Sequence, residues 1–451
     1  MSHTLTASPT PDIPALLLQL AILLITARML GELAQRCKQP AVVGEILAGI
    51  VLGPSLLSGL FPAFGAWFIP NTPIQGHLLA LVSLIGVMFF LLTIGLETDV
   101  SMIRKQARSA LGVALGGLVI PLIVGFFLGQ FVPDTLLVNP DHRIVFALFM
   151  AIAMSISAIP VIAKVLMDLS LIRRTIGQTV IASAMIDDLV GWILLSIVIG
   201  MASGQELTLH SVGLSVLTVT GFMLVSLTLG LWAVKHLFNS VQSKLRMPDK
   251  QLTLIVTLML IWGTIGHALG IEALLGAFTV GIIFAQIPQL NSDTVSKLKS
   301  ISLGIFTPIF FAASGLKVDV IGLLKPDTLL LTVLVIGIAI SCKMIGVYLG
   351  ARFIGKDDHW TAVFYGAGLN ARGSMGIIVA NIGFSLQILS QDMFSIITVM
   401  ALFTSLMTPV IMKIAVKRID MHDQQSETGA EEKILLVCQE ENRQTLPTYC
   451  G

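Results

Sequence analysis

The stretch Val180-IASAMIDDLVGWILLSIVIG-Met201 carries two adjacent aspartates, Asp187 and Asp188, in the middle of an apolar run long enough to cross a bilayer. An aspartate at the centre of a membrane helix costs about 2.5–3.5 kcal/mol on insertion scales. The run contains no Lys or Arg, so any charge partner must come from another segment. Two such residues therefore point to a function, such as binding a cation or a proton.

The composition of the whole chain is that of a membrane protein with many spans. Of the 451 residues, 55% are hydrophobic and only 12% are charged, with a mean hydropathy of +0.91. A soluble protein would carry about 25% charged residues. The net charge of +1 gives no reason to expect nucleic acid as a partner. The first basic residue is Arg28, so the first apolar run lacks the basic region of a signal peptide and reads as a retained helix.

The four cysteines (Cys37, Cys342, Cys438 and Cys450) are scattered without metal-ligand spacing, which predicts free thiols. Phosphate-binding loops and cofactor motifs are also missing from the sequence. We therefore expect neither an enzyme nor a cofactor-dependent or ATP-driven protein.

Apolar stretches of about 20 residues predict an all-α fold of thirteen transmembrane helices. They lie near 14–35, 40–57, 77–97, 107–131, 144–169, 174–202, 208–237, 250–268, 271–287, 295–316, 328–353, 359–386 and 391–417. This count leaves 18 Lys and Arg residues on one side of the membrane and three (Arg143, Lys317 and Lys325) on the other. By the positive-inside rule, the N-terminus lies outside and the C-terminus in the cytoplasm.

Two pairs of segments repeat in the same order along the chain. Val43-GEILAG-Ile50 in the second segment matches Leu275-GAFTVG-Ile282 in the ninth. Phe89-FLLTIGLETD-Val100, at the end of the third, matches Phe310-FAASGLKVD-Val320, at the end of the tenth. Segments two and nine are seven steps apart and so cross in opposite directions. The pattern predicts an inverted repeat, the architecture of secondary transporters.

Two segments contain residues that interrupt a helix. In the fifth, Met154-SISAIPVIAKV-Leu166 includes Ser155, Ser157 and Pro160, which lacks an amide donor and clashes with the preceding turn. In the twelfth, Ala367-GLNARGSMGI-Ile378 places Asn370 and Arg372 among glycines. Matching interruptions in the two halves point to a binding site with two broken helices. A simple proline kink is the alternative for the fifth segment.

Lys343 is the natural partner for one of the aspartates. It lies nine residues from Arg352, or about 13 Å along a helix, which is too deep for easy snorkelling. Adjacent helical residues point about 100° apart, so one aspartate can pair with Lys343 while the other faces a water-filled cavity. A purely structural ion pair would need only one aspartate.

Other polar residues in the apolar segments favour structural interpretations. Arg372 is expected to neutralise the carbonyls at a half-helix C-terminus, and Glu45 to be a packing acid rather than a second proton site. Lys164 is expected to snorkel to the cytoplasmic surface. Three histidines near helix ends are expected to be interfacial: His77, His267 and His359.

Together these motifs resemble the second branch of the monovalent cation:proton antiporter superfamily over about residues 30–417. The matching stretches are Pro40-AVVGEILAGIVLGPSL-Leu57, Phe90-LLTIGLET-Asp99, Ser155-ISAIPVIAKV-Leu166, Asp187-Asp188 and Gly366-AGLNARGSM-Gly376. The Ser155 segment and Ala401-LFTSLMT-Pro409 look most like the plant cation/H⁺ exchanger subgroup and its bacterial relatives. That subgroup usually has Asn-Asp where this chain has Asp187-Asp188, which instead resembles the electrogenic bacterial sodium/proton antiporters. The resemblance therefore leaves ion choice and stoichiometry open.

The resemblance implies a homodimer in the cell (inner) membrane. Its dimer domain would comprise about 14–97 and 250–316, its core about 107–202 and 328–417, and its linker helix 208–237. Residues 1–13 would be an outer tail. Asp188 would be the required ion- and proton-binding carboxylate, Asp187 would pair with Lys343, and Ser157 would lie at the helix break. Ser155, Pro160, Asn370 and Arg372 would support the broken helices.

Residues 418–451 read as a polar cytoplasmic tail that includes a short strand at Lys433-ILL-Val437. This tail resembles the start of a regulatory domain that is either truncated or naturally lacking.

The sequence thus predicts a secondary antiporter that exchanges Na⁺, or K⁺ or Li⁺, for H⁺ at Asp188 by alternating access. If cation binding also released Lys343 from Asp187 and Lys343 then lost its proton, two protons would move for each cation. K⁺/H⁺ exchange or regulated K⁺ efflux is the alternative within transport, and a non-transporting sensor is a remote one. An intramembrane aspartyl protease is disfavoured, because its two aspartates would come from different helices.

Overall fold

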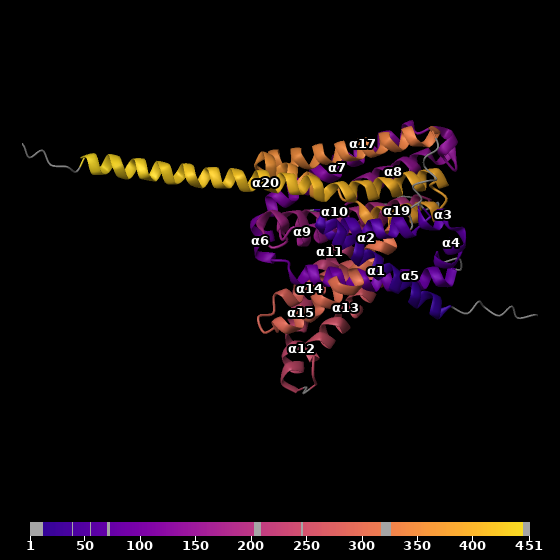
Figure 1. Ribbon diagram of the computed structural model, residues 1–451, viewed down its shortest axis with the longest axis horizontal. Coiled ribbons are helices and arrows are strands. Elements are labelled where there is room, and N and C mark those ends of the chain that lie inside the picture. The colour runs from indigo at the N-terminus through magenta and orange to yellow at the C-terminus, as the bar shows by residue number, and fades with distance from the viewer. Residues whose placement is uncertain are drawn as a thin grey trace, which may run out of the picture.

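The computed structural model describes residues 12–37, 39–54, 56–69, 73–202, 209–244, 247–316 and 326–444. Lys317, Lys325 and most of the predicted N-terminal tail lie outside these residues. The described part of the chain is a bundle of helices with one isolated β-bridge, Leu137 to Leu389 (Figure 1). The all-α prediction is confirmed. Cys37 and Cys342 are free thiols, as predicted, whereas the side chains of Cys438 and Cys450 lie outside the described part.

Ten helices in the described ranges are long and apolar enough to cross a membrane. The predicted spans at 40–57 and 271–287 correspond to the shorter apolar helices α2 (Ala41–Leu52) and α14 (Ala273–Ala285). The predicted span at 359–386 corresponds to α18 (His359–Leu369) and α19 (Gly373–Ser385). The chain is thus a multi-pass membrane protein, and the count of thirteen spans stays a prediction.

The helices pack in two groups. The first contains α1 (Ile13–Arg36), α2, α5 (Pro73–Leu96), α13 (Lys250–Ala268), α14, α15 (Ser292–Ile301) and α16 (Thr307–Gly315). The second contains α7 (Ala107–Phe131), α8 (Arg143–Ser155), α9 (Ile159–Asp168), α10 (Thr175–Ala202), α17 (Pro326–Leu349), α18, α19 and α20 (Gln391–Gln444). Between them in sequence run α11 (Leu209–Val225) and α12 (Leu231–Lys244), joined by one π-helical turn. Short helices α3 (Leu57–Leu60), α4 (Pro62–Phe68) and α6 (Val100–Lys105) connect longer ones.

Glycines bring helix backbones into contact within the first group. A Cβ atom on Gly49 of α2 would lie 1.9 Å from a backbone oxygen of α16, beside Gly315. In the same way, Gly281 of α14 packs against Gly95 of α5. The first contact joins predicted segments two (α2) and ten (α16), and the second joins segments nine (α14) and three (α5). If segment two corresponds to segment nine and segment three to segment ten, the repeat converts each contact into the other. Both contacts support the predicted inverted repeat.

The C-terminal helix differs from the prediction. Figure 1 shows α20 extending far beyond the bundle, and residues 433–437 are helical. The predicted strand at Lys433–Val437 is wrong. The preceding residues 424–432 are rich in Gln and Glu, which are good helix formers, and they allow the membrane helix to continue.

Candidate functional site

Both predicted helix breaks are present, and they lie side by side. Helix α8 ends at Ser155, and α9 begins at Ile159 after three residues without helical structure. Helix α18 ends at Leu369, and α19 begins at Gly373. The amide of Ala158 donates a hydrogen bond of 2.7 Å to the carbonyl of Ala371, so the two unwound stretches touch.

Pro160 lies beside a break between two helices, as predicted, and not at a kink within one continuous helix, which was the alternative. It lies in the first turn of α9, where a missing amide hydrogen costs nothing because that amide would have no helical partner. Gly373 begins α19 with φ +39°, and a Cβ atom there would lie 2.3 Å from the side chain of Val161. The breaks are therefore fixed by local backbone chemistry as well as by packing.

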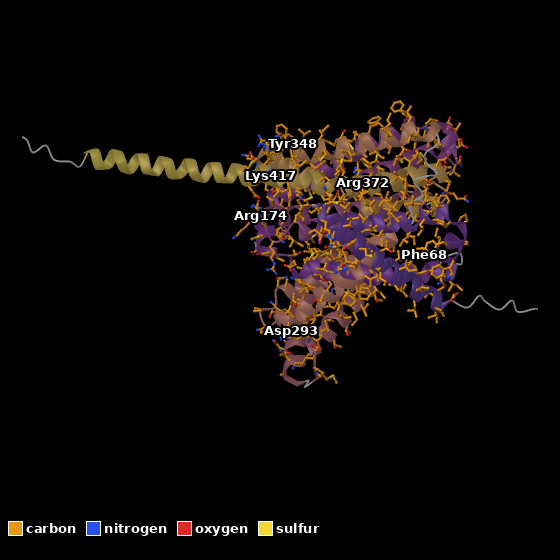
Figure 2. The ribbon with its side chains drawn as sticks, viewed as in Figure 1. Phe68, Arg174, Asp293, Tyr348, Arg372 and Lys417 are labelled. Atoms are coloured by element: carbon orange, nitrogen blue, oxygen red, sulfur yellow. The ribbon has the colours of Figure 1, made fainter. Side chains whose placement is uncertain are left out.

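Arg372 is one of two basic side chains that donate to backbone carbonyls at the breaks; the other is Lys343. Arg372 is fully buried and donates to the carbonyls of Met154 (2.7 Å) and Ala339 (2.9 Å) and to Oδ1 of Asn370 (2.7 Å). Met154 belongs to the last turn of α8, where the helix dipole places partial negative charge. The structural role predicted for Arg372 matches these contacts. Figure 2 shows Arg372 inside the bundle.

Lys343 and Asp187 form a buried ion pair. The sequence predicted that Lys343 pairs with one of the two aspartates, and the family resemblance implied that this one is Asp187. The distance from Nζ to Oδ2 is 2.8 Å, and both side chains are 0% exposed. Nζ also donates to the carbonyl of Ser155, at the end of α8. The hydroxyl of Ser157 lies within hydrogen-bond distance of the same Asp187 oxygen and 2.7 Å from the carbonyl of Leu369, at the end of α18. Asp187 is therefore tied directly to α17 and, through Lys343 and Ser157, to the ends of α8 and α18.

Asp188 has a different environment from that of its neighbour. Its side chain is partly exposed, whereas that of Asp187 is buried; the Oδ1 atoms of both residues are buried without a hydrogen-bond partner among the described residues. Neither Lys343 nor Arg372 forms an ion pair with Asp188, because both are engaged elsewhere. The structure thus places the two aspartates in different environments: Asp187 is paired with a basic side chain, and Asp188 is not.

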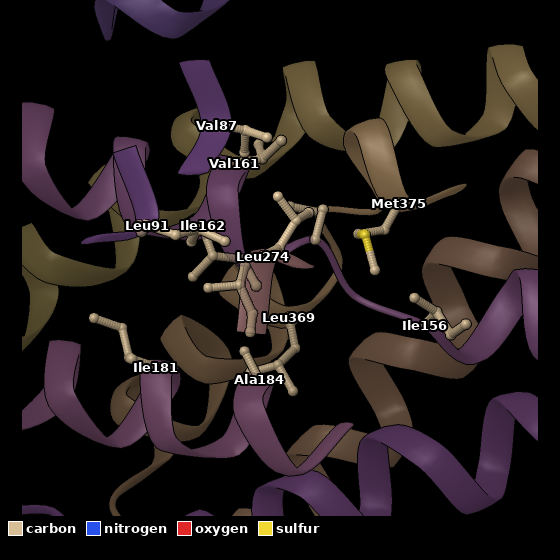
Figure 3. Close-up of a cluster of buried hydrophobic side chains, with 14 of the residues drawn as sticks. Val87, Leu91, Ile156, Val161, Ile162, Ile181, Ala184, Leu274, Leu369 and Met375 are labelled. Atoms are coloured by element: carbon tan, nitrogen blue, oxygen red, sulfur yellow. The ribbon is translucent and has the colours of Figure 1, made fainter. Parts of the chain in front are cut away.

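Packing around the breaks is apolar and involves both helix groups. Figure 3 shows Ile156 from the first unwound stretch and Leu369 at the end of α18, together with Val161 and Met375 from the helices that follow the two breaks. Leu274 of α14, from the first group, lies in the same cluster. The apolar surroundings keep the dielectric constant low, which strengthens every charge interaction at the site.

Sequence reasoning missed two residues that satisfy the broken helices. The hydroxyl of Ser405 accepts a hydrogen bond of 2.8 Å from the amide of Gly373, and Thr408 donates to the carbonyl of Ala367. Both come from α20. The signal was the polar pattern of the Ala401–Pro409 motif, in which three hydroxyl residues lie within an apolar run.

Lys164 was predicted to snorkel to the cytoplasmic surface, and this prediction is wrong. It is 6% exposed and forms ion pairs with Asp168 (3.1 Å) and Glu45 (3.6 Å). Because α9 packs against α2, its end has no open route to the surface, and two carboxylates hold the ammonium group in place. Glu45 is thus a packing acid that joins the two helix groups.

The three histidines (His77, His267 and His359) are exposed near helix ends, in agreement with an interfacial position.

On the side predicted to be cytoplasmic, Glu97 binds both Arg173 and Lys299 and so connects the two groups. Burial alone would raise the pKa of Glu97, but the hydrogen bonds and charges of Arg173 and Lys299 outweigh it and lower the pKa below 4.5. Gln178 of α10 donates to the carbonyl of Glu97. These contacts close one end of the interface between the groups.

Comparison with known proteins agrees with this geometry. The transmembrane domain of the sodium/hydrogen exchanger family matches residues 20–418. The chain belongs to the sodium/hydrogen exchanger family.

Several relatives match over nearly all of the chain. The Na⁺/H⁺ antiporter NhaS4 of Synechocystis is 33% identical over 409 residues, covering 89% of this chain and 98% of the relative. The Na⁺/H⁺-K⁺ antiporter GerN of Bacillus cereus is 28% identical, covering 88% and 95%. Cation/H⁺ antiporter 19 of Arabidopsis thaliana is 33% identical, and this chain spans 50% of its length.

Among solved structures, the sodium proton antiporter MjNhaP1 of Methanocaldococcus jannaschii has the same fold. The TM-score is 0.64 over 89% of this chain and 99% of that protein, at 15% sequence identity. The shared fold is that of a multi-pass antiporter.

Proposed function

We propose that this chain is a secondary antiporter that exchanges Na⁺ for H⁺, with both ions competing for Asp188. Family membership supports cation/proton exchange in general. The observation that carries the assignment to Asp188 is the difference in charge partners: Asp187 is paired with Lys343 and contacts Ser157, whereas Asp188 forms no ion pair among the described residues and has a buried, unpartnered Oδ1.

The proposed mechanism follows from the cost of moving charge through low dielectric. An unoccupied Asp188 carboxylate is negative and expensive to move through an apolar interface, whereas a protonated or cation-bound carboxylate is neutral. Only the occupied site moves cheaply, so the two ions exchange and neither leaks. In this proposal α7–α10 and α17–α20 form a core that slides against a dimer domain formed by α1–α5 and α13–α16.

The contacts between the two groups give this movement defined endpoints. Lys164 with Glu45 and Arg173 with Glu97 both join the groups on the side predicted to be cytoplasmic. They must break for that side to open. We propose that the protein lies in the inner membrane as a homodimer, with its N-terminus outside and its C-terminus in the cytoplasm.

K⁺/H⁺ exchange is the second candidate. The relatives include GerN, named for Na⁺, H⁺ and K⁺, and K⁺/H⁺ antiporter 1 of Saccharomyces cerevisiae, which is 27% identical over 402 residues. Selectivity between Na⁺ and K⁺ depends on dehydration and on the dimensions of the site.

The test uses purified protein in liposomes with an imposed pH gradient and a pH-sensitive dye. Na⁺, Li⁺ and K⁺ are added in turn to wild type, Asp188→Asn and the control Asp141→Asn, which removes an exposed carboxylate of the short 3-10 helix before α8. We expect Na⁺ and Li⁺ to move protons in wild type and in the control but not in Asp188→Asn. A response to K⁺ alone would favour the second candidate, and equal traces from all three proteins would contradict antiport at Asp188.

A further inference from the structure

Glu272 is a second carboxylate beside the candidate site that the mechanism above does not use. It occupies the residue before the first turn of α14, but its side chain makes no capping hydrogen bond. Its Oε2 atom is buried and has no partner among the described residues. Leaving a buried carboxylate oxygen unpaired is costly, which is the condition that binding a cation would relieve.

Glu272, at the start of α14, lies near the part of α10 that carries Asp188. The residue before it, Ile271, and Leu275 pack with Leu189 and Ile193 of α10. Leu189 follows Asp188 directly in the chain. The two carboxylates are close enough for the charge of Glu272 to act on Asp188. Figure 3 shows the next residue but one, Leu274, among the residues at the helix breaks.

Glu272 also lines a cavity of about 520 Å³ between the two helix groups. The walls come from α5 and α16 on one side and from α19 on the other. Glu272 is the one charged residue among the lining residues described, and the other polar ones are Ser83 and Ser314. Both serine hydroxyls donate to carbonyls of their own helices, so the lone pairs on their oxygen atoms are free to coordinate a cation.

No basic side chain in the described part of the chain forms an ion pair with Glu272, whereas Asp187 is paired with Lys343 and Glu45 with Lys164. The charge and the oxygen atoms at Glu272 therefore suit a small hard cation, which oxygen ligands bind best. By the orientation proposed above, the cavity lies on the outer side of Asp188.

We propose that Glu272 is a second cation-binding carboxylate, which receives the monovalent cation in this cavity and delivers it to Asp188. Glu272 and Asp188 come from different helix groups, so the cation would pass from one group to the other when it moves between them. This inference rests on the proposed antiport function and adds an entry site to it.

The experiment measures uptake of radioactive Na⁺ by proteoliposomes and separates KM from Vmax. Glu272→Gln keeps the shape of the side chain and removes its charge, so KM should rise about tenfold with Vmax nearly unchanged, as expected for the loss of one nearby charge in a partly desolvated site. Glu272→Asp retains the carboxylate and should recover most of the affinity. Asp141→Asn should leave KM unchanged.

A second readout reports binding without transport. Na⁺ should raise the unfolding temperature of the detergent-solubilised wild type, because a ligand stabilises the state that binds it. The same rise should need about tenfold more Na⁺ in Glu272→Gln.

Unchanged KM and unchanged thermal response in Glu272→Gln, with wild type active and Asp188→Asn silent, would overturn the inference and leave the antiport function intact. A loss of Vmax at constant KM that Glu272→Asp does not restore would also overturn it, since it would indicate a structural role. Equal uptake by wild type and Asp188→Asn would contradict the antiport function itself.

Discussion

Replacing Lys343 by methionine tests whether the buried pair with Asp187 holds the core together. At 2.8 Å and an effective dielectric constant of about 20, the attraction between the two charges is about 6 kcal/mol before desolvation is subtracted. Removing one partner leaves a buried charge uncompensated, which costs about 3–5 kcal/mol. Asp187 would then retain only the contact with Ser157, and the carbonyl of Ser155 would lose its donor.

The double variant makes this prediction specific to the pair. Asp187→Asn should also destabilise by about 3–5 kcal/mol, but the double variant Lys343→Met/Asp187→Asn should cost at least about 2 kcal/mol less than the sum. The measurement is the free energy of unfolding of the purified protein in mixed micelles, by titration with SDS. Lys235→Met, which removes an exposed lysine of α12, is the control and should change stability by less than about 0.5 kcal/mol. Additive single effects would refute the reasoning.

Two further changes test the interface between and within the helix groups. Gly49→Ala places a Cβ atom 1.9 Å from a backbone oxygen of α16 and should destabilise the protein by about 1–3 kcal/mol or more. Its control is Gly337→Ala, where nothing lies within 4 Å of the added Cβ atom, and it should be neutral or slightly stabilising. Equal effects of the two changes in SDS titration would contradict the packing. Because Arg173 and Lys299 lower the pKa of Glu97, their contribution to stability is fully present above pH 4.5 and is lost as the pH falls through the lowered pKa. Glu97→Gln should therefore be less stable than wild type at pH 7, with the difference shrinking at acidic pH and at high salt, and a difference independent of pH would count against the cluster.

The fold could be predicted from the sequence to a large extent because the bilayer limits the choices. A helix satisfies its own backbone in lipid, so the long apolar runs become helices near their predicted bounds, apart from the two runs that are broken at the site. The run at 107–131, for example, is the helix Ala107–Phe131. The tail at 433–437 lacks this constraint, and there the short apolar stretch predicted a strand where the chain is helical.

The site could be predicted in part for a related reason. A charge inside the membrane needs a partner, and Lys343 lies too deep for easy snorkelling, so its pairing with one of the two aspartates could be predicted. The choice of Asp187 came from the family resemblance. Lys164 was misassigned because its position along the chain gave no information about the helix packed over it. Glu272 was missed because it lies at the start of an apolar run, where an exposed acid is usual. Only the packing shows that its neighbours in the chain contact the segment of α10 that follows Asp188.

The most direct test of the account is the Na⁺ dependence of uptake over a series of pH values, measured with radioactive Na⁺ in proteoliposomes. If Na⁺ and H⁺ compete for Asp188, the apparent KM for Na⁺ should rise by up to about tenfold per unit fall in pH at the acidic end, while Vmax stays constant. Asp188→Asn should show no saturable uptake at any pH. A KM that does not change with pH while Vmax falls, or saturable uptake by Asp188→Asn, would contradict competition at this carboxylate.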